Sequence, residues 1–121
     1  MIEIGINSEV LKKIIEGQKT VEGRLAKDKF LSIKPGDIIS IREDIYKDSL
    51  IVKSIADAAA IQVIELKKFP TFKKMLTDVG FARAIPDAKD LEEACEAYEL
   101  YYSAEDEQRY GVLAISFVLT K

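Results

Sequence analysis

Histidine is absent from this sequence, and Cys95 is its only cysteine. Without histidine there is no Ser-His-Asp triad, no imidazole general base and no His-ligated metal. One cysteine cannot form an internal disulfide or a structural zinc site. Any catalysis would therefore rely on Lys, Arg, carboxylates, Tyr or hydroxyl groups, and we expect neither a metal nor a cofactor.

Long hydrophobic runs are also absent. No apolar stretch approaches the ~18 residues that a membrane helix needs. The N-terminus, residues 1–5, lacks the basic head and apolar core of a signal peptide. We expect no membrane association and a cytoplasmic location.

The length and apolar content suit one domain over residues 1–121. The chain has 121 residues, of which 48% are hydrophobic. Domains of roughly 100–150 residues are the commonest, and this apolar content is close to the globular norm. A chain of this size buries enough surface to fold without disulfides or bound metals.

Charge is unevenly distributed along the chain. The formal net charge is −3, which argues against a nonspecific nucleic-acid coat. Residues 87–107 carry nine acids and one lysine, whereas residues 12–34 and 66–83 each carry four more bases than acids. Two interpretations stay open: a basic cleft on an acidic protein, or ordinary solvated faces.

The pattern of apolar residues predicts an α+β fold that is mainly β. Strands are predicted at 2–6, 19–25, 38–41, 49–55, 60–66 and 112–120. Helices are predicted from Ser8 to Gly17, from Pro70-Thr71 to Gly80, at about 88–102 after an Asp87 cap, and in a short turn after Ser103. Strands and helices do not alternate, so we expect a small barrel of five or six mostly antiparallel strands with three or four flanking helices.

One short segment concentrates the chemistry. Lys19, Glu22 and Arg24 fall within a stretch of six residues that belongs to a predicted strand. On a regular strand Glu22 and Arg24 share one face with Thr20, and Lys19 joins them only if Gly17 or a bulge turns it. Arg offers a planar fork for phosphate, Lys a point charge or base, and Glu an acceptor for an amine. The alternative is a surface ion network of little energetic worth.

The same segment carries a family resemblance. Gly17-x-Lys19-x-x-Glu22-x-Arg24-Leu25, followed by the turn at 34–38 and the late segments 101–105 and 110–115, resembles the ASCH (activating signal cointegrator homology) domain of the PUA-like superfamily. The resemblance implies a β-barrel beside a cleft, lined by Lys19, Glu22 and Arg24, that binds RNA or a nucleotide-like ligand.

The family also implies an enzymatic alternative. It contains small amidohydrolases that deacylate N4-acetylcytidine with a Lys, a Thr three residues later and a Glu on a following helix. Lys19 matches, but Glu22 stands at the Thr position, the nearest hydroxyl is Thr20, and the nearest acid in the later stretch is Asp78. If the chain is a hydrolase of a modified nucleoside or RNA, its catalytic candidates are Lys19, Thr20 and Glu22.

Two further surfaces are weaker candidates. A secondary basic surface interleaves lysines with Phe69 and Phe72, a pattern that can track a nucleic-acid backbone; its members are Lys67, Lys68, Lys73 and Lys74. The alternative is an amphipathic helix whose Phe side chains, Phe69 and Phe72, lie in the core and whose lysines are solvated. The acidic segment 87–107 suits a basic protein partner, or simple solubility.

Overall fold

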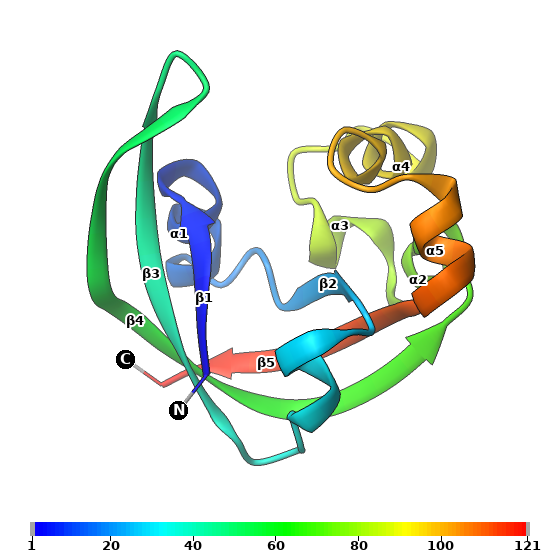
Figure 1. Ribbon diagram of the computed structural model, residues 1–121, viewed down its shortest axis with the longest axis horizontal. Coiled ribbons are helices and arrows are strands. Elements are labelled where there is room, and N and C mark those ends of the chain that lie inside the picture. The colour runs from blue at the N-terminus through cyan, green and yellow to red at the C-terminus, as the bar shows by residue number, and fades with distance from the viewer. Residues whose placement is uncertain (1, 121) are drawn as a thin grey trace.

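A curled five-stranded sheet with helices packed on part of it forms the fold (Figure 1). The computed structural model describes residues 2–120. The strands are β1 (Ile2–Asn7), β2 (Val21–Leu25), β3 (Ile38–Lys47), β4 (Leu50–Phe69) and β5 (Val112–Leu119). The helices are α1 (Ser8–Ile15), the 3-10 turn η1 (Asp28–Ser32), α2 (Phe72–Val79), α3 (Phe81–Ala84), α4 (Leu91–Glu99) and α5 (Ala104–Tyr110). The predicted class, α+β and mainly β, is confirmed.

The strand order is β1-β3-β4-β5-β2. β1 and β3 run parallel, and the other three pairings are antiparallel. β5 lies inside the sheet, which explains why its sequence is apolar on both faces. Both edge strands, β1 and β2, come from the first quarter of the chain, and the sheet curls so that they approach each other (Figure 1).

The prediction of two separate strands at 49–55 and 60–66 was wrong. β4 is one strand of 20 residues that pairs with β3 along its first part and with β5 along its second. Asp57 has a left-handed backbone (φ 54°), and residues 56–58 bulge opposite Arg42. The bulge lets one strand change direction instead of ending. Beyond the bulge, the β3–β4 hairpin projects from the rest of the sheet (Figure 1).

Two apolar clusters lie on opposite faces of β2. Val21 and Leu25 pack with α2, α3 and α4, around Phe72, Met75 and Tyr98. Glu22 and Arg24 point to the other face, because they pair with Ile115 and Leu113, which belong to the cluster built on β1, β3 and α1. The period of two along β2 therefore places these two charges together beside an apolar interior.

Several helix boundaries differ from the predicted ones. Asn7, not Ser8, caps α1, because the Val10 amide donates to Asn7 Oδ1 at 2.9 Å. Ile15, the last residue of α1, is about half exposed. α4 begins after an Asp90 cap rather than an Asp87 cap. The predicted starts at Thr71 and Ser103 are confirmed, since both side chains accept from the amide three residues later.

The helix count was also too low. α3, a single turn over Phe81–Ala84, was not predicted, because four residues are too few to show a helical period. Within residues 2–120, none of the helices is sufficiently long and apolar to cross a bilayer.

Candidate functional site

Lys19, Glu22 and Arg24 converge on the Glu22 carboxylate. Lys19 Nζ lies 3.1 Å from Glu22 Oε1, and Arg24 Nε lies 2.6 Å from Glu22 Oε2. Each carboxylate oxygen thus faces one cation. We call these three residues the charged cluster; its net charge is +1.

The loop after α1 turns Lys19 toward Glu22. Gly17 has φ 81°, a conformation that favours glycine, and the Lys19 amide donates to Lys13 O at 3.1 Å. Lys19 therefore precedes β2, and its side chain reaches the face of the strand that carries Glu22. The sequence allowed this placement only if the chain entered the strand irregularly, as it does at Gly17.

The Lys19 ammonium is fully coordinated. It is 3% exposed and donates to Val21 O at 2.9 Å and to Ala84 O at 2.6 Å, besides its contact with Glu22. Two of its three N–H donors are used by these carbonyl groups, and the Glu22 carboxylate supplies the counter-charge. Lys19 is held as a fixed positive charge.

Glu22 is ionised although it is buried. It is 8% exposed, and burial by itself raises the pKa of a carboxyl group. The charges of Lys19 and Arg24, with their hydrogen bonds, outweigh burial and hold the pKa of Glu22 below its ordinary value. Glu22 in turn raises the pKa of Arg24 against the opposing effect of burial.

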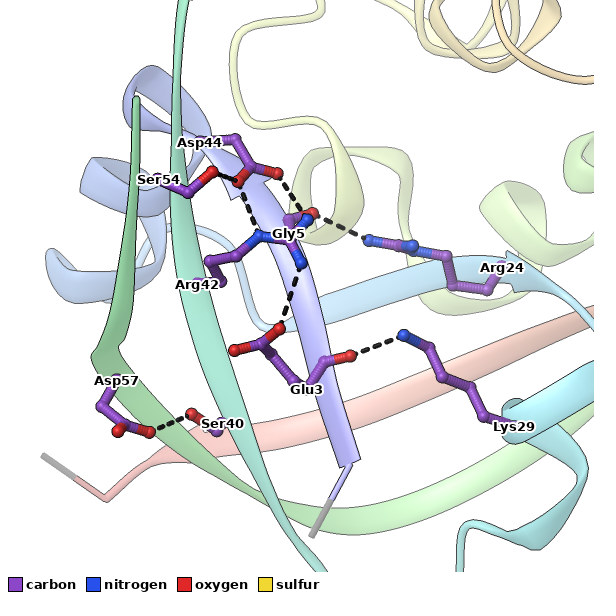
Figure 2. A network of polar contacts seen from close by, with 9 residues as sticks. All are labelled: Glu3, Gly5, Arg24, Lys29, Ser40, Arg42, Asp44, Ser54 and Asp57. Carbon is purple, nitrogen blue, oxygen red and sulfur yellow. Dashed lines mark hydrogen bonds and ion pairs between the residues drawn. The ribbon is translucent and has the colours of Figure 1, made fainter. Parts of the chain in front are cut away.

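Arg24 is the member of the cluster that meets solvent. Its side chain is 20% exposed, its Nη2 lies 3.4 Å from Gly5 O, and its guanidinium carbon lies 5.4 Å from the centre of the Phe30 ring. Lys29 Nζ donates to Glu3 O at 2.6 Å. Figure 2 shows both side chains reaching the edge of β1 that does not pair with β3. They therefore supply donors to an edge that has no neighbouring strand in the described part of the chain.

A small cavity adjoins the cluster. It has a volume of about 110 Å³ and lies between α1 and the segment after α3, with Lys19, Val10 and Ile85 among its lining residues. Lys13 and Asp87, 3.2 Å apart, pair across its rim. Glu22 and Arg24 do not line this cavity, so it contains one of the three cluster residues.

Of the three catalytic candidates, the structure brings only Lys19 and Glu22 into contact. Thr20 is held by its main chain, whose amide donates to Arg83 O at 2.9 Å and whose carbonyl accepts from Phe117. Asp78 pairs with Lys67 at 3.3 Å, on exposed surface rather than beside Lys19. In the described part of the chain, no three acidic or cysteine side chains gather as metal ligands would.

The secondary basic surface borders a broad, open hollow. The hollow has a volume of about 720 Å³ and is lined by Phe69, Lys73, Lys74, Thr77 and Asp78. All four lysines of this surface are exposed. Phe72 is buried in the core, as the alternative interpretation predicted, whereas Phe69 is only partly buried and lines the hollow.

Sequence reasoning missed a polar network on β1 and β3. Arg42 contacts Asp44 at 2.7 and 2.9 Å and Glu3 at 3.0 Å, and Ser54 donates to Asp44 at 2.8 Å (Figure 2). The hydrogen bond from Arg42 is the main cause that lowers the pKa of Asp44, against burial. In both strands, polar residues stand between isoleucines, and this alternation could have signalled the network. Because β1 and β3 pair in parallel register, their polar residues share one face of the sheet.

The arrangement around β2 can be compared with known proteins. The model of the ASCH domain family matches residues 4–121. The chain belongs to the ASCH domain family. The predicted resemblance is therefore confirmed, and it covers all but the first three residues.

Solved structures share this ASCH fold along nearly the whole chain. The crystal structure of the hypothetical protein PH0355 is 32% identical, with 97% of this chain and 96% of that chain covered and a TM-score of 0.81. The solution NMR structure of PF0455 from Pyrococcus furiosus is 30% identical, with 99% and 97% covered and a TM-score of 0.76. Protein EF3133 from Enterococcus faecalis is 14% identical, with 93% and 70% covered and a TM-score of 0.52, and shows the fold alone. No curated protein sequence is significantly similar to this chain.

Proposed function

We propose that this ASCH domain is a binding module for RNA or a nucleotide-like ligand, and that the ligand's phosphate contacts Arg24. The observation that carries the proposal is the charged cluster itself: two cations share one buried carboxylate, and the surplus charge faces solvent at Arg24. A positive charge held next to a low-dielectric interior attracts an anion more strongly than one surrounded by water. ASCH domains are often linked to RNA binding, which supports the same assignment.

Each residue has a distinct part in the proposed site. Glu22 engages Arg24 through Nε, which leaves the N–H groups of the two Nη atoms as donors, one of them aimed at Gly5 O. A guanidinium presents such donors as a rigid fork that matches two phosphate oxygens. Lys19 fixes Glu22 from the other side, so the fork is oriented before the ligand arrives.

The hydrolase alternative gains no support from this geometry. A lysine that acts as a base or nucleophile must present a lone pair, and a fully coordinated ammonium has none. Lys19 donates to Val21 O and Ala84 O and forms an ion pair with Glu22, and the Thr20 hydroxyl forms no hydrogen bond with it within residues 2–120. We therefore retain binding as the function.

A binding titration tests the proposal. A fluorescently labelled single-stranded 12-nucleotide RNA and a labelled mononucleotide are titrated at fixed salt with the wild type, Arg24→Gln, Arg24→Lys and the matched surface control Lys53→Gln. We expect Arg24→Gln to weaken both ligands at least tenfold, because a charge-assisted contact is lost. The affinity of Arg24→Lys should lie between those of the wild type and Arg24→Gln, because lysine keeps the positive charge but lacks the planar fork of donors.

Lys53 lies exposed on the β3–β4 hairpin, so its variant should bind like the wild type. Circular dichroism spectra and melting curves verify that each variant is folded. Wild-type affinity of folded Arg24→Gln for both ligands would overturn the proposal.

A further inference from the structure

Four contacts between cations and aromatic rings gather in one region of the surface. Arg24 and Lys29 lie over the Phe30 ring, at 5.4 and 5.5 Å from its centre. Lys27 and Arg109 lie over the Tyr110 ring, at 4.9 and 5.2 Å. We call these six residues the aromatic–basic strip.

The two halves of the strip are physically joined. Phe30 donates its amide to Lys27 O at 3.2 Å, which closes the turn at the start of η1. Ala26 donates to Gly111 O at 3.0 Å, which ties this turn to the junction of α5 and β5. Residues some 80 positions apart thus form one surface.

The strip is accessible and strongly positive. Lys29 and Arg109 are exposed, and Lys27, Phe30 and Tyr110 are partly exposed. Its four cations are interrupted by one acid on η1, Asp28. The acids of α5 lie in its first turn, away from Arg109 in its last turn, and one of them, Glu107, accepts from the Phe72 amide at 2.9 Å.

Intramolecular stability alone is a weak reason for this arrangement. At exposed sites each cation–ring contact contributes only about 0.5–1 kcal/mol. Rings flanked by cations are, in contrast, what proteins use to hold unpaired nucleic acid: bases stack on aromatic faces or on guanidinium planes, and cations follow the phosphates.

We propose that the aromatic–basic strip binds consecutive nucleotides of single-stranded RNA, with bases stacked at Phe30 and Tyr110 and phosphates beside Lys27 and Arg109. This rests on the proposed function, because Arg24 belongs to both the charged cluster and the strip. It also narrows that function: the ligand is a single-stranded segment of several nucleotides rather than a mononucleotide. Lys29, whose ammonium also donates to Glu3 O, ties the start of η1 to β1 (Figure 2).

The test separates the strip from the charged cluster. Labelled single-stranded RNA of 12 nucleotides and a labelled mononucleotide are titrated at several salt concentrations with the wild type, the double variant Lys27→Gln/Arg109→Gln, and Arg24→Gln. For the double variant we expect at least tenfold weaker binding of the 12-mer and a mononucleotide affinity within twofold of wild type. Its salt slope should fall by about 1.4, since each phosphate contact on a single strand contributes about 0.7.

The rings are tested in the same assay. Tyr110→Leu keeps an apolar side chain but lacks a stacking face, and should bind the 12-mer about tenfold more weakly. Tyr110→Phe keeps the face and should bind like the wild type, which distinguishes stacking from misfolding. A matched duplex RNA, whose bases are already stacked, should bind more weakly than the single strand.

The possible results distinguish a failure of the strip from a failure of the proposed function. If the double variant and Tyr110→Leu bind the 12-mer with wild-type affinity and salt slope while Arg24→Gln weakens both ligands, the strip is overturned and the proposed function stands. If Arg24→Gln changes neither ligand, the proposed function is overturned. Weaker binding of the mononucleotide by the double variant, to the same extent as the 12-mer, would also contradict the strip.

Discussion

Replacing Glu22 with Gln removes the one negative charge that Lys19 and Arg24 share. Gln keeps the size of the side chain, but it is neutral and has one acceptor oxygen instead of two. Lys19, 3% exposed, would keep two carbonyl partners and lose its counter-charge. Removing one partner of a buried ion pair costs about 3–5 kcal/mol, because a charge is left buried and unpaired.

We expect the low end of that range for Glu22→Gln, a loss of about 3 kcal/mol in the free energy of unfolding. Arg24 is a fifth exposed and can be solvated again, whereas Lys19 cannot. Urea unfolding at pH 7, followed by circular dichroism, should show a midpoint lowered by about 1.5 M for a slope near 2 kcal/mol/M. Glu65→Gln, an exposed acid on β4, is the matched control and should stay within about 0.5 kcal/mol of wild type.

Acid pH supplies a second test of the same pair. The pKa of Glu22 is lowered in the folded protein, so its ionised form stabilises the fold above the ordinary pKa of about 4.3. This contribution to stability is lost as the pH falls from the ordinary pKa of a glutamate through the lower pKa of Glu22 in the folded protein. The difference between wild type and Glu22→Gln should therefore shrink with decreasing pH. A difference below about 1 kcal/mol at pH 7, or one independent of pH, would refute the reasoning.

Two further substitutions probe groups around the cluster. Among residues 2–120, the Tyr98 hydroxyl, buried beside Gly23, has no partner at hydrogen-bonding geometry, so Tyr98→Phe should raise the free energy of unfolding by up to about 1 kcal/mol; a loss instead would reveal a partner. Burial first, and then the charge of Glu22, raise the pKa of Tyr98, so wild type should lose stability as pH rises above about 10 and the variant should lose less. A methyl group on Gly5 would clash with Arg42 Nη2 and Asp44 Oδ2, so Gly5→Ala should lower the melting temperature by about 5 °C. The same change in an Arg42→Ala background should cost clearly less, and an equal cost would contradict the proposed clash.

Local patterns predicted much of the fold. The alternation at 2–6 and the apolar run at 112–120 correctly predicted two strands, β1 and β5. Helix caps were misplaced where two good capping residues stand close together, as with Asn7 and Ser8. The continuity of β4 was missed because Ala58-Ala59-Ala60 has weak strand propensity, and only pairing with two different neighbours keeps it extended.

The candidate site was predictable in its members but not in its geometry. The spacing of Glu22 and Arg24 places them on one face of a strand, whereas the approach of Lys19 depends on the loop after α1. The contact of Arg24 with Gly5 exists only because the sheet curls until its edges meet. Phe30 and Tyr110 are brought together by tertiary structure, and no local pattern signals that.

The most direct test of the account observes Arg24 itself. The Nε–H of Arg24, held at 2.6 Å by Glu22 Oε2, should give its own resonance in ¹⁵N–¹H NMR spectra at low temperature. Assigned by its loss in Arg24→Lys, this resonance should shift progressively as the 12-nucleotide single-stranded RNA is added, and saturate with the affinity measured by titration. An Arg24 Nε–H that stays in place while RNA saturates the protein would contradict the central claim.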